Sequence, residues 1–231
     1  MRKFSLFIKR AFDIVAAIIL IVLLTVIPFF IIIPVLIRLT SKGPAVFTQD
    51  RVGKNGKIFK IYKFRTMRIP EDSLDENGQP IPPKKRITKI GAFLRKTSLD
   101  EIMQLFNIVN GTMSFVGPRP TLPYQVERYN DVQKTRHNMR PGITGWAQVH
   151  GRNDLTWTQK IEYDVEYINK FSLWMDIKIF FKTVAVVLKM DGIAFSKDDA
   201  INAKTPAAAV VSSNSTADVA EPENVNPEDK P

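Results

Sequence analysis

The chain contains no cysteine among its 231 residues and only two histidines. The absence of cysteine excludes a disulfide-stapled secreted miniprotein, a thiolate metal site and a thiol nucleophile. Any active site must therefore use oxygen and nitrogen groups. The length is sufficient for one core of ordinary domain size, with appendages.

Charged residues are absent from the 24 positions between Ile14 and Ile37, where only Thr25, Pro28 and Pro34 interrupt an aliphatic and aromatic run. Such a run belongs in lipid, and it is longer than the ~7 to 15 residue apolar core of a secretory signal. As a helix it would measure ~36 Å, against a hydrocarbon core of ~30 Å, so its length permits a crossing.

Basic residues flank this run on both sides, which favours a helical hairpin over a straight crossing. They are Arg2, Lys3, Lys9 and Arg10 before the run, and Arg38, Lys42, Arg51, Lys54, Lys57, Lys60 and Lys63 after it. Both flanks are typical of cytoplasmic ends, and a straight span would place one of them outside. Pro28 divides the run into arms of roughly 14 and 9 residues, each too short to cross alone. Because proline also occurs in spanning helices, a single crossing stays open.

The C-terminal segment differs in composition from the rest. Residues 204–231 hold two Lys, five Asp or Glu and no aromatic residue, so the remainder carries a net charge of +13 rather than +10. We predict a disordered acidic tail there. The basic body predicts an anionic partner, and nucleic acid, anionic lipid or a phosphate-bearing substrate would each fit. We expect a membrane helix at 1–40, a cytosolic domain at 41–203 and the tail at 204–231.

A basic β-hairpin is predicted directly after the apolar run. The segments AVFTQDR and KIFKIYKFRTM read as two strands around a turn that contains Asn55 and Gly56. In the second strand, Lys60 and Lys63 fall on different faces, and a solvated sheet face would also explain these lysines. Residues 70–83 are predicted to be a loop because of their prolines and polar residues.

A helix is predicted to begin after Ser98, since apolar residues follow at positions 99, 102, 103, 106 and 109. Ser98 would be the N-cap and Glu101 would complete a capping box, while the helix dipole would keep Asp100 ionised. Such patterns are common, so a purely structural role for both acids stays open. A chemical role is favoured by the basic residues that precede them: Arg86, Lys89, Arg95 and Lys96.

Arginines in restrained surroundings follow the two acids. Pro118 and Pro120 fix the backbone on both sides of Arg119, which suits a guanidinium presented to a phosphate, although proline-rich turns with a solvent-facing arginine are frequent. The block at 136–154 adds three glycines and three more arginines, Arg136, Arg140 and Arg152. His137 and His150 are isolated, and a catalytic role is not favoured for either.

The region from about 157 to 188 shows two helical patterns. The first has Ile161, Val165 and Ile168 on one face. The second has Leu173, Ile177, Phe180, Phe181, Val184 and Leu188. The second helix, with its aromatic residues and interspersed lysines, is suited either to a membrane interface or to burial against the domain core.

Four blocks occur in order along the chain: KRAFD, FTQDRVGKNGKIFKIYKFRTM, LRKTSLDEIMQLFNIVNGTMSFVGPRP and RPGITGWAQVHGRND. With them, the chain resembles the bacterial sugar transferases called monotopic phosphoglycosyl transferases, from residue 9 to about 190. A series of long matching blocks is far more specific than any single motif. We expect the small form of this family, because no large N-terminal extension precedes the blocks.

The resemblance implies that the protein moves a sugar phosphate from a UDP-sugar to undecaprenyl phosphate, releases UMP and requires Mg²⁺. It implies that Asp100 and Glu101 are the catalytic pair and the metal-binding residues, with Asp100 forming a covalent phosphosugar intermediate. The family's phosphate-binding arginines match Arg95 and Arg119. Three further basic residues are expected to bind substrate phosphates: Lys63, Arg140 and Arg152.

The family's N-terminal helix is a re-entrant hairpin broken at a proline, which matches Pro28. The resemblance thus implies an α+β monotopic membrane protein with a small cytosolic catalytic domain and amphipathic interfacial helices. Its expected place is the cytoplasmic face of the bacterial inner membrane, in contact with lipid and not with nucleic acid.

Three residues depart from the family pattern. Ile27 stands before the breaking proline where serine is common, which affects hydrogen bonding inside the hairpin. Thr112 stands where an acid is usual, and we expect little effect on catalysis. His150 replaces a commoner asparagine, with a role in sugar preference or none.

The physical chemistry of the proposed reaction agrees with the resemblance. A carboxylate is a weak nucleophile toward a negatively charged diphosphate, so its attack requires a divalent cation and arginines, and oxygen ligands favour Mg²⁺. The competing hypotheses are a membrane-anchored basic module that binds anionic lipid or nucleic acid without catalysis, and a scaffold in an envelope complex. Loss of turnover in Asp100→Asn would distinguish the enzyme. The residues do not reveal which sugar is transferred.

Overall fold

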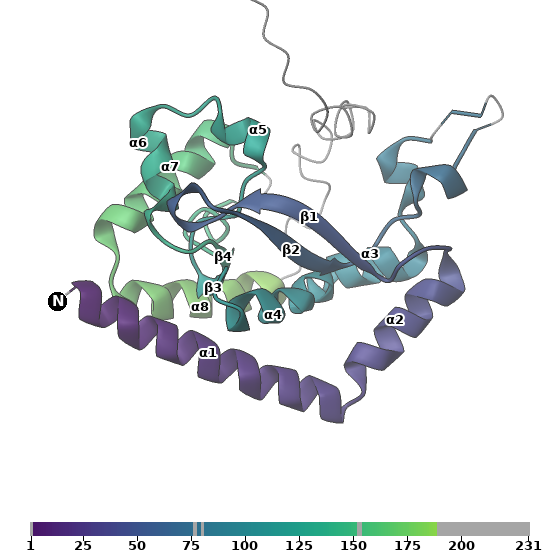
Figure 1. Cartoon of the computed structure of the whole chain (residues 1–231), viewed down its shortest axis with the longest axis horizontal. Helices are drawn as coiled ribbons and strands as arrows, with labels where there is room; N and C mark the ends of the chain where they lie inside the picture. Colours follow the sequence, from purple (N-terminus) through teal and green to yellow (C-terminus); the bar gives the residue numbers. More distant parts are fainter. Residues whose placement is uncertain (1, 76–77, 80, 152–153, 189–231) are drawn as a thin grey trace, which may run out of the picture.

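The computed structural model describes residues 2–75, 78–79, 81–151 and 154–188 (Figure 1). The main elements are α1 (Arg2–Val26), α2 (Phe29–Thr40), β1 (Val46–Val52), β2 (Ile58–Phe64), α3 (Lys89–Lys96), the 3₁₀ helix η4 (Leu99–Met103), α4 (Gln104–Val109), β3 (Ser114–Val116), α5 (Pro123–Val126), α6 (Asp131–Lys134), the 3₁₀ helix η5 (Thr135–Asn138), β4 (Gly142–Thr144), α7 (Trp157–Lys170) and α8 (Leu173–Leu188). This mixture of helices and short strands confirms the α+β class. The predicted tail at 204–231 and the domain end at 203 lie outside the described residues.

The apolar run is broken where Pro28 predicted it. Helices α1 and α2 meet there with a bend of 64° (Figure 1). Within the described part of the chain, neither helix alone has the length and apolar composition of a membrane span; the bent pair together has both, as a broken span or a re-entrant loop would. Pro34 lies inside α2 without ending it. The Pro28 position is therefore the break, and both arms remain helical.

The outer and inner faces of α1 differ in character. Its exposed apolar side chains include Phe4, Phe7, Phe12, Val15, Ile19 and Val22. On the inner face, the Lys9 ammonium lies 2.7 Å from the Asp176 carboxylate of α8. Asp13 accepts hydrogen bonds from the Ser114 hydroxyl at 2.7 Å and from the Phe115 N–H at 3.3 Å. Helix α1 is thus fixed to the α+β domain by buried polar contacts.

Strands β1 and β2 form the predicted antiparallel hairpin, with Val52 opposite Ile58. The turn between them contains Asn55 and Gly56 with φ of 57° and 76°, a left-handed conformation that asparagine and glycine tolerate. The hairpin lies across the middle of the molecule, between the helices of its two ends (Figure 1). Its central position brings both strands close to the candidate site.

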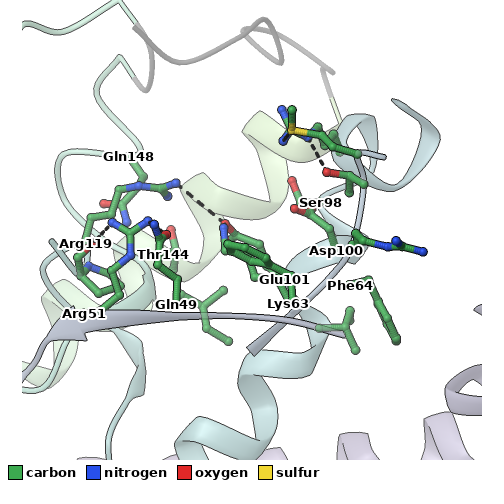
Figure 2. Close-up of a pocket in the computed structure, with 18 of the residues that line it drawn as sticks. Gln49, Arg51, Lys63, Phe64, Ser98, Asp100, Glu101, Arg119, Thr144 and Gln148 are labelled. Carbon is green, nitrogen blue, oxygen red and sulfur yellow. Dashed lines mark hydrogen bonds and ion pairs between the residues drawn. The ribbon is translucent and has the colours of Figure 1, made fainter. Parts of the chain in front are cut away.

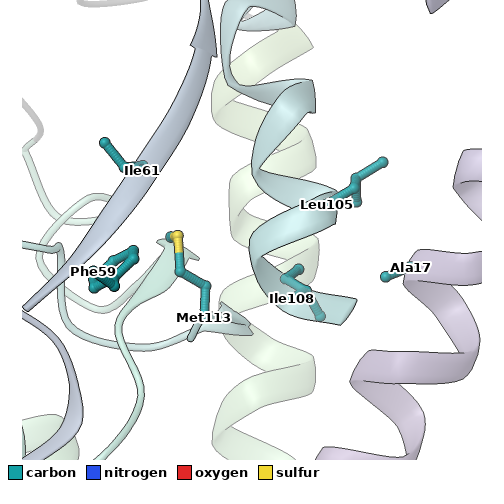
Figure 3. Close-up of a cluster of buried hydrophobic side chains, with 6 residues drawn as sticks. All are labelled: Ala17, Phe59, Ile61, Leu105, Ile108 and Met113. Atoms are coloured by element: carbon teal, nitrogen blue, oxygen red, sulfur yellow. The ribbon is translucent and has the colours of Figure 1, made fainter. Parts of the chain in front are cut away.

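The core beside the hairpin joins α1 to the domain (Figure 3). It consists of Ala17, Phe59, Ile61, Leu105, Ile108 and Met113, all buried. Phe59 and Ile61 share one face of β2, so Lys63, two positions further, extends from the same face. Lys63 is therefore directed inward, and the solvated-face interpretation does not hold for it.

The helix predicted after Ser98 is two different helices in the structure. Residues 99–103 form the 3₁₀ helix η4, and only 104–109 form the α-helix α4. Leu105 and Ile108 are buried, whereas Phe106 and Val109, which were predicted on the buried face, are 37% and 38% exposed. A 3₁₀ helix has 3.0 residues per turn, so the period of 3.6 does not continue across the junction.

The C-terminal helices confirm one predicted face and contradict the burial of the other. Ile161 and Ile168 of α7 are buried. On α8 the buried apolar residue is Ile179, and the predicted apolar face is exposed at Trp174, Ile177, Phe180, Phe181 and Val184. Burial of that face against the core is therefore excluded, while its placement in a membrane interface stays a prediction.

Candidate active site

A cleft lies between the hairpin, α3, η4 and the segment 117–121 (Figure 2). Its polar wall includes Lys63, Arg95, Asp100, Glu101 and Arg119. Five of the predicted site residues, from four separate parts of the chain, thus face one space. Leu20 and Leu24 of α1 also line the cleft, so it extends to the apolar run.

The backbone before the two acids does not form the predicted capping box. Ser98 has φ 57° and ψ 17°, a left-handed conformation, and its side chain makes no capping hydrogen bond. The Glu101 N–H instead donates to the Ser98 carbonyl at 3.2 Å. The expectation was wrong because the chain turns sharply at Ser98 into a 3₁₀ helix, which leaves the Glu101 side chain available to other partners.

Those partners are cations. The Lys63 ammonium donates to Glu101 Oε1 at 2.6 Å, and a guanidinium nitrogen of Arg119 lies 3.9 Å from the same oxygen (Figure 2). Burial by itself raises the pKa of Glu101, but Lys63 and Arg119 outweigh it and hold that pKa below its ordinary value. Glu101 is therefore an ionised group with a fixed ammonium partner.

Asp100 has the opposite electrostatic character. Burial, and then the charge of Glu101, raise its pKa to about 6, against the smaller opposing effects of Lys63 and Arg95. The pKa of Asp100 is therefore not lowered as a helix dipole would lower it, since desolvation and like charge dominate. Two adjacent carboxylates are thus differentiated, with Glu101 strongly ionised and Asp100 the more basic of the two.

The two arginines predicted to bind phosphate lie at different sides of this pair. Arg95 donates from Nε to the Thr66 hydroxyl at 2.8 Å, which sets the plane of its guanidinium. The Arg119 side chain is 47% exposed and reaches toward Glu101 across the cleft (Figure 2). Cations from two directions thus surround the position at which an anionic ligand would meet Asp100.

Of the two other predicted phosphate-binding residues, Arg140 does not line the cleft. Arg140 donates from Nε to the Gly111 carbonyl at 2.8 Å and lines a small separate cavity beside Arg10 and Asp13. Arg152 lies outside the described residues. A phosphate-binding role for Arg140 and Arg152 therefore stays a prediction without support from the cleft geometry.

The two histidines are explained by packing. His137 stacks on Tyr129 with ring centroids 6.2 Å apart, and burial, followed by the charge of Arg136, lowers its pKa to about 4. His150 stacks on Tyr163, and its Nδ1 lies 2.7 Å from the Trp146 carbonyl. Neither ring lines the cleft.

Two of the residues that depart from the expected pattern also lie away from the cleft. The Thr112 hydroxyl lies in the turn after α4, 3.1 Å from the Asn107 carbonyl. Ile27 is 63% exposed at the end of α1.

Several polar residues of the cleft were missed by the sequence interpretation. They are Gln49, Arg51, Thr144 and Gln148 (Figure 2). Arg51 had been counted only as a basic flank. The one available signal was that Gln49 and Arg51 are two positions apart in a predicted strand, so their side chains share one face. Thr144 and Gln148 carried no local signal because the fold brings them to the cleft from a distant part of the chain.

Asp100 and Glu101 could take part in binding Mg²⁺. Both offer hard oxygen ligands, and burial and then the charge of Glu101 raise the pKa of Asp100, so a bound cation would offset the second cause. Within the described residues there is no group of three or more acidic or histidine side chains suited to a metal ion. Because Mg²⁺ is commonly held by one or two carboxylates together with substrate phosphates, the pair fits a site that is completed by the substrate.

The α+β domain, the bent apolar helix pair and the cleft with two carboxylates and several cations are the features that the sequence blocks predicted. The family model for bacterial sugar transferases matches residues 4–190. The chain belongs to this family, which confirms the resemblance inferred from the sequence blocks.

Three relatives illustrate its range. An uncharacterised sugar transferase, EpsL of Bacillus subtilis (strain 168), is 45% identical over 185 residues, which cover 80% of this chain and 89% of the relative. The UDP-glucose:undecaprenyl-phosphate glucose-1-phosphate transferase of Escherichia coli (strain K12) is 43% identical, covering 76% of this chain and 39% of the relative. The UDP-N-acetylgalactosamine-undecaprenyl-phosphate N-acetylgalactosaminephosphotransferase of Aeromonas hydrophila is 44% identical, covering 79% and 44%. The chain thus spans most of one relative and less than half of the other two.

Proposed function

We propose that the protein transfers a sugar 1-phosphate from a UDP-sugar to undecaprenyl phosphate, giving undecaprenyl-diphosphate-sugar and UMP. The names of the Escherichia coli and Aeromonas hydrophila relatives describe this type of reaction with different sugars. Family membership and these names support the general reaction, and the chemistry of the cleft supports its division among particular residues. The binding-module alternative has no comparable support.

The single observation that carries the proposal is the difference between the two adjacent carboxylates. Glu101 is paired with Lys63 at 2.6 Å, whereas the pKa of Asp100 is raised to about 6 by burial and by Glu101. A carboxylate with a raised pKa is more basic, yet at neutral pH it is still mainly ionised. Asp100 therefore suits a nucleophile and Glu101 suits a fixed electrostatic role.

In the first step, an Asp100 oxygen attacks the phosphorus atom that bears the sugar. The new bond is an acyl phosphate, and the bond from that phosphorus to the bridging oxygen breaks, so UMP leaves with the electron pair. In the second step, a phosphate oxygen of undecaprenyl phosphate attacks the same phosphorus and displaces the Asp100 carboxylate. The product is the lipid diphosphate sugar, and no outside acid, base or oxidant is consumed.

The surrounding cations would lower the barrier to both steps. Arg119 and Arg95 approach the acid pair from different sides, and preorganised guanidinium groups stabilise the charge that develops on phosphoryl oxygens. Lys63 keeps Glu101 ionised and in place. Mg²⁺ bound by this acid pair and by substrate phosphates would supply further charge neutralisation.

A membrane location agrees with the nature of the acceptor. We propose that α1 and α2 form a re-entrant hairpin on the cytoplasmic face of the bacterial inner membrane. The phosphate of a polyprenyl lipid lies at headgroup level, and the cleft extends to Leu20 and Leu24 of the apolar run. The exposed apolar face of α8 would lie in the same interface.

The decisive experiment uses the purified full chain in lipid nanodiscs. A panel of UDP-sugars is supplied with undecaprenyl phosphate and Mg²⁺, and UMP release is measured. At least one UDP-sugar should give UMP and a lipid diphosphate sugar. Absence of turnover with the entire panel would refute the reaction, because the panel covers the common bacterial UDP-sugars.

The covalent step is tested separately by intact-mass measurement without the lipid acceptor. Wild-type protein should gain the mass of one sugar phosphate, and Asp100→Asn should gain none. An equal adduct on Asp100→Asn would move the nucleophile to another residue, with Glu101 as the first alternative.

A further inference from the structure

The segment 117–121 that presents Arg119 has no regular secondary structure, yet its backbone is anchored at every step. Four consecutive carbonyl oxygens, those of residues 118 to 121, each accept a hydrogen bond. The donors are, in order, Gly142 N (2.9 Å), an Arg136 guanidinium nitrogen (2.9 Å), an Arg51 guanidinium nitrogen (3.3 Å) and Val52 N (2.8 Å). The two outer anchors are backbone groups next to or within the short strands, and the two inner anchors are arginine side chains.

Arg136 is an unusual anchor because it is almost completely buried. Its side chain is 2% exposed, and that of its ion-pair partner, Asp164 of α7, is 1% exposed. Nη2 makes the contacts with Asp164 and with the Arg119 carbonyl, and Nη1 donates to the Tyr129 hydroxyl at 2.9 Å. One guanidinium thus joins a carboxylate, a phenol and the carbonyl of Arg119.

A buried ion pair is weak evidence of a gain in stability, because desolvation of both charges offsets their attraction. Its geometric effect is clearer. Arg136 can contact the Arg119 carbonyl only while Asp164 compensates its charge in the buried site. Arg119, in turn, is the residue whose side chain reaches from this segment toward Glu101, at 3.9 Å.

We propose that Arg136 and Asp164 are positioning residues that fix the backbone at Arg119 and so direct its guanidinium to the phosphates of the substrate. This inference rests on the proposed function and deepens it, since it links η5 and α7 to the reaction. Both residues border the cleft, but their side chains are only 2% and 1% exposed, so neither is placed to touch the reacting atoms. Both act through Arg119, and their effect on turnover depends on the presence of the Arg119 side chain.

A double-mutant cycle tests this dependence. Arg136→Lys keeps the charge but cannot reach three acceptors as the planar guanidinium does. In an otherwise wild-type chain it should lower kcat/KM for the UDP-sugar about tenfold, since small displacements of a positioning group have effects of this order. In an Arg119→Ala background the same change should lower the residual kcat/KM by less than about twofold. Equal effects in both backgrounds, or no effect in either, would overturn the proposal.

Asp164→Asn provides the second arm, with Asp176→Asn as its matched control. Asp176 is also a largely buried carboxylate, paired with Lys9 and hydrogen-bonded to Tyr167, but its partners do not anchor the Arg119 segment. Both variants should lower the thermal midpoint, and only Asp164→Asn should show an effect on kcat/KM that disappears with Arg119→Ala. If Asp164→Asn instead lowers kcat/KM by the same factor with and without Arg119→Ala, it does not act through Arg119, and the proposal is contradicted.

Two other results are also decisive. If neither Arg136→Lys nor Asp164→Asn can be purified folded, the pair is needed for folding rather than for positioning, and the proposal is overturned. Wild-type protein without turnover on any UDP-sugar would instead refute the proposed function, so the two failures are distinguishable.

Discussion

Asp100 is held in surroundings that disfavour its ionised form, and this leads to a prediction about stability. Its pKa is raised from 3.8 to about 6, first by burial and then by Glu101. In the unfolded chain its pKa is close to the ordinary value, so above pH 6 the folded state holds a charge that the unfolded state holds more easily. Replacement by the neutral Asn should therefore stabilise the protein at pH 8 while it abolishes turnover.

The expected magnitude follows from the displacement of the pKa. A difference of about 2 pKa units corresponds to roughly 3 kcal/mol. For a chain of this size, 1 kcal/mol changes the melting temperature by about 2 to 4 °C. Asp100→Asn should therefore melt roughly 6 to 12 °C above wild type at pH 8.

The dependence on pH gives this prediction its specificity. A group whose folded pKa is raised destabilises the fold above that pKa, and the penalty disappears as pH falls from about 6 toward about 4, where Asp100 is protonated. The difference between Asp100→Asn and wild type should close over the same range. Differential scanning fluorimetry on tryptophan emission in nanodiscs would measure it, with the exposed Asp50→Asn as a control that should show no gain. A destabilised Asp100→Asn, or a gain that does not depend on pH, would refute the reasoning.

Three further predictions concern the partners of this site and the topology. Glu101→Gln should destabilise the protein at pH 8 by about 3 to 5 kcal/mol in thermal or denaturant unfolding, because it leaves the Lys63 ammonium without its carboxylate; unchanged stability would mean that the pair is solvated. Arg119→Lys should lower turnover at least about tenfold in the UMP assay, since it keeps the charge but loses the two-pronged fork, and near-normal kcat would make Arg119 a structural residue. Lys3→Cys and Lys42→Cys should both stay unlabelled by a membrane-impermeant thiol reagent in spheroplasts, and both should be labelled after the inner membrane is opened. Labelling of position 3 alone before the membrane is opened would indicate a straight crossing.

Local features of the fold could be predicted from the sequence because short-range chemistry decides them. The Asn55-Gly56 turn tolerates left-handed backbone, and Pro28 cannot donate the hydrogen bond that a continuous helix requires. The helical periodicity of α7 also identified its buried face. In each case the residues that determine the structure lie within a few positions of one another.

Features that depend on distant partners could not be predicted. The left-handed turn at Ser98 and the 3₁₀ geometry of η4 direct Glu101 to Lys63, 38 positions away, instead of to a capping box. Arg136 is buried because Asp164 meets it from α7, 28 positions later. On α8 the exposed aromatic face satisfied the same periodicity as a buried one, so the pattern alone could not decide which side faces the domain.

The Lys9–Asp176 contact has a consequence for how the protein is made. The two residues are separated by 167 positions, and ribosomes add about 5 to 20 residues per second. Lys9 therefore emerges roughly 8 to 30 seconds before its partner, together with Asp13, whose Ser114 partner also comes later. During that interval Lys9 and Asp13 lack the partners that they have in the folded protein. Final seating of α1 is completed only when α8 has been synthesised, which makes the docking of α1 onto the domain a late step of folding.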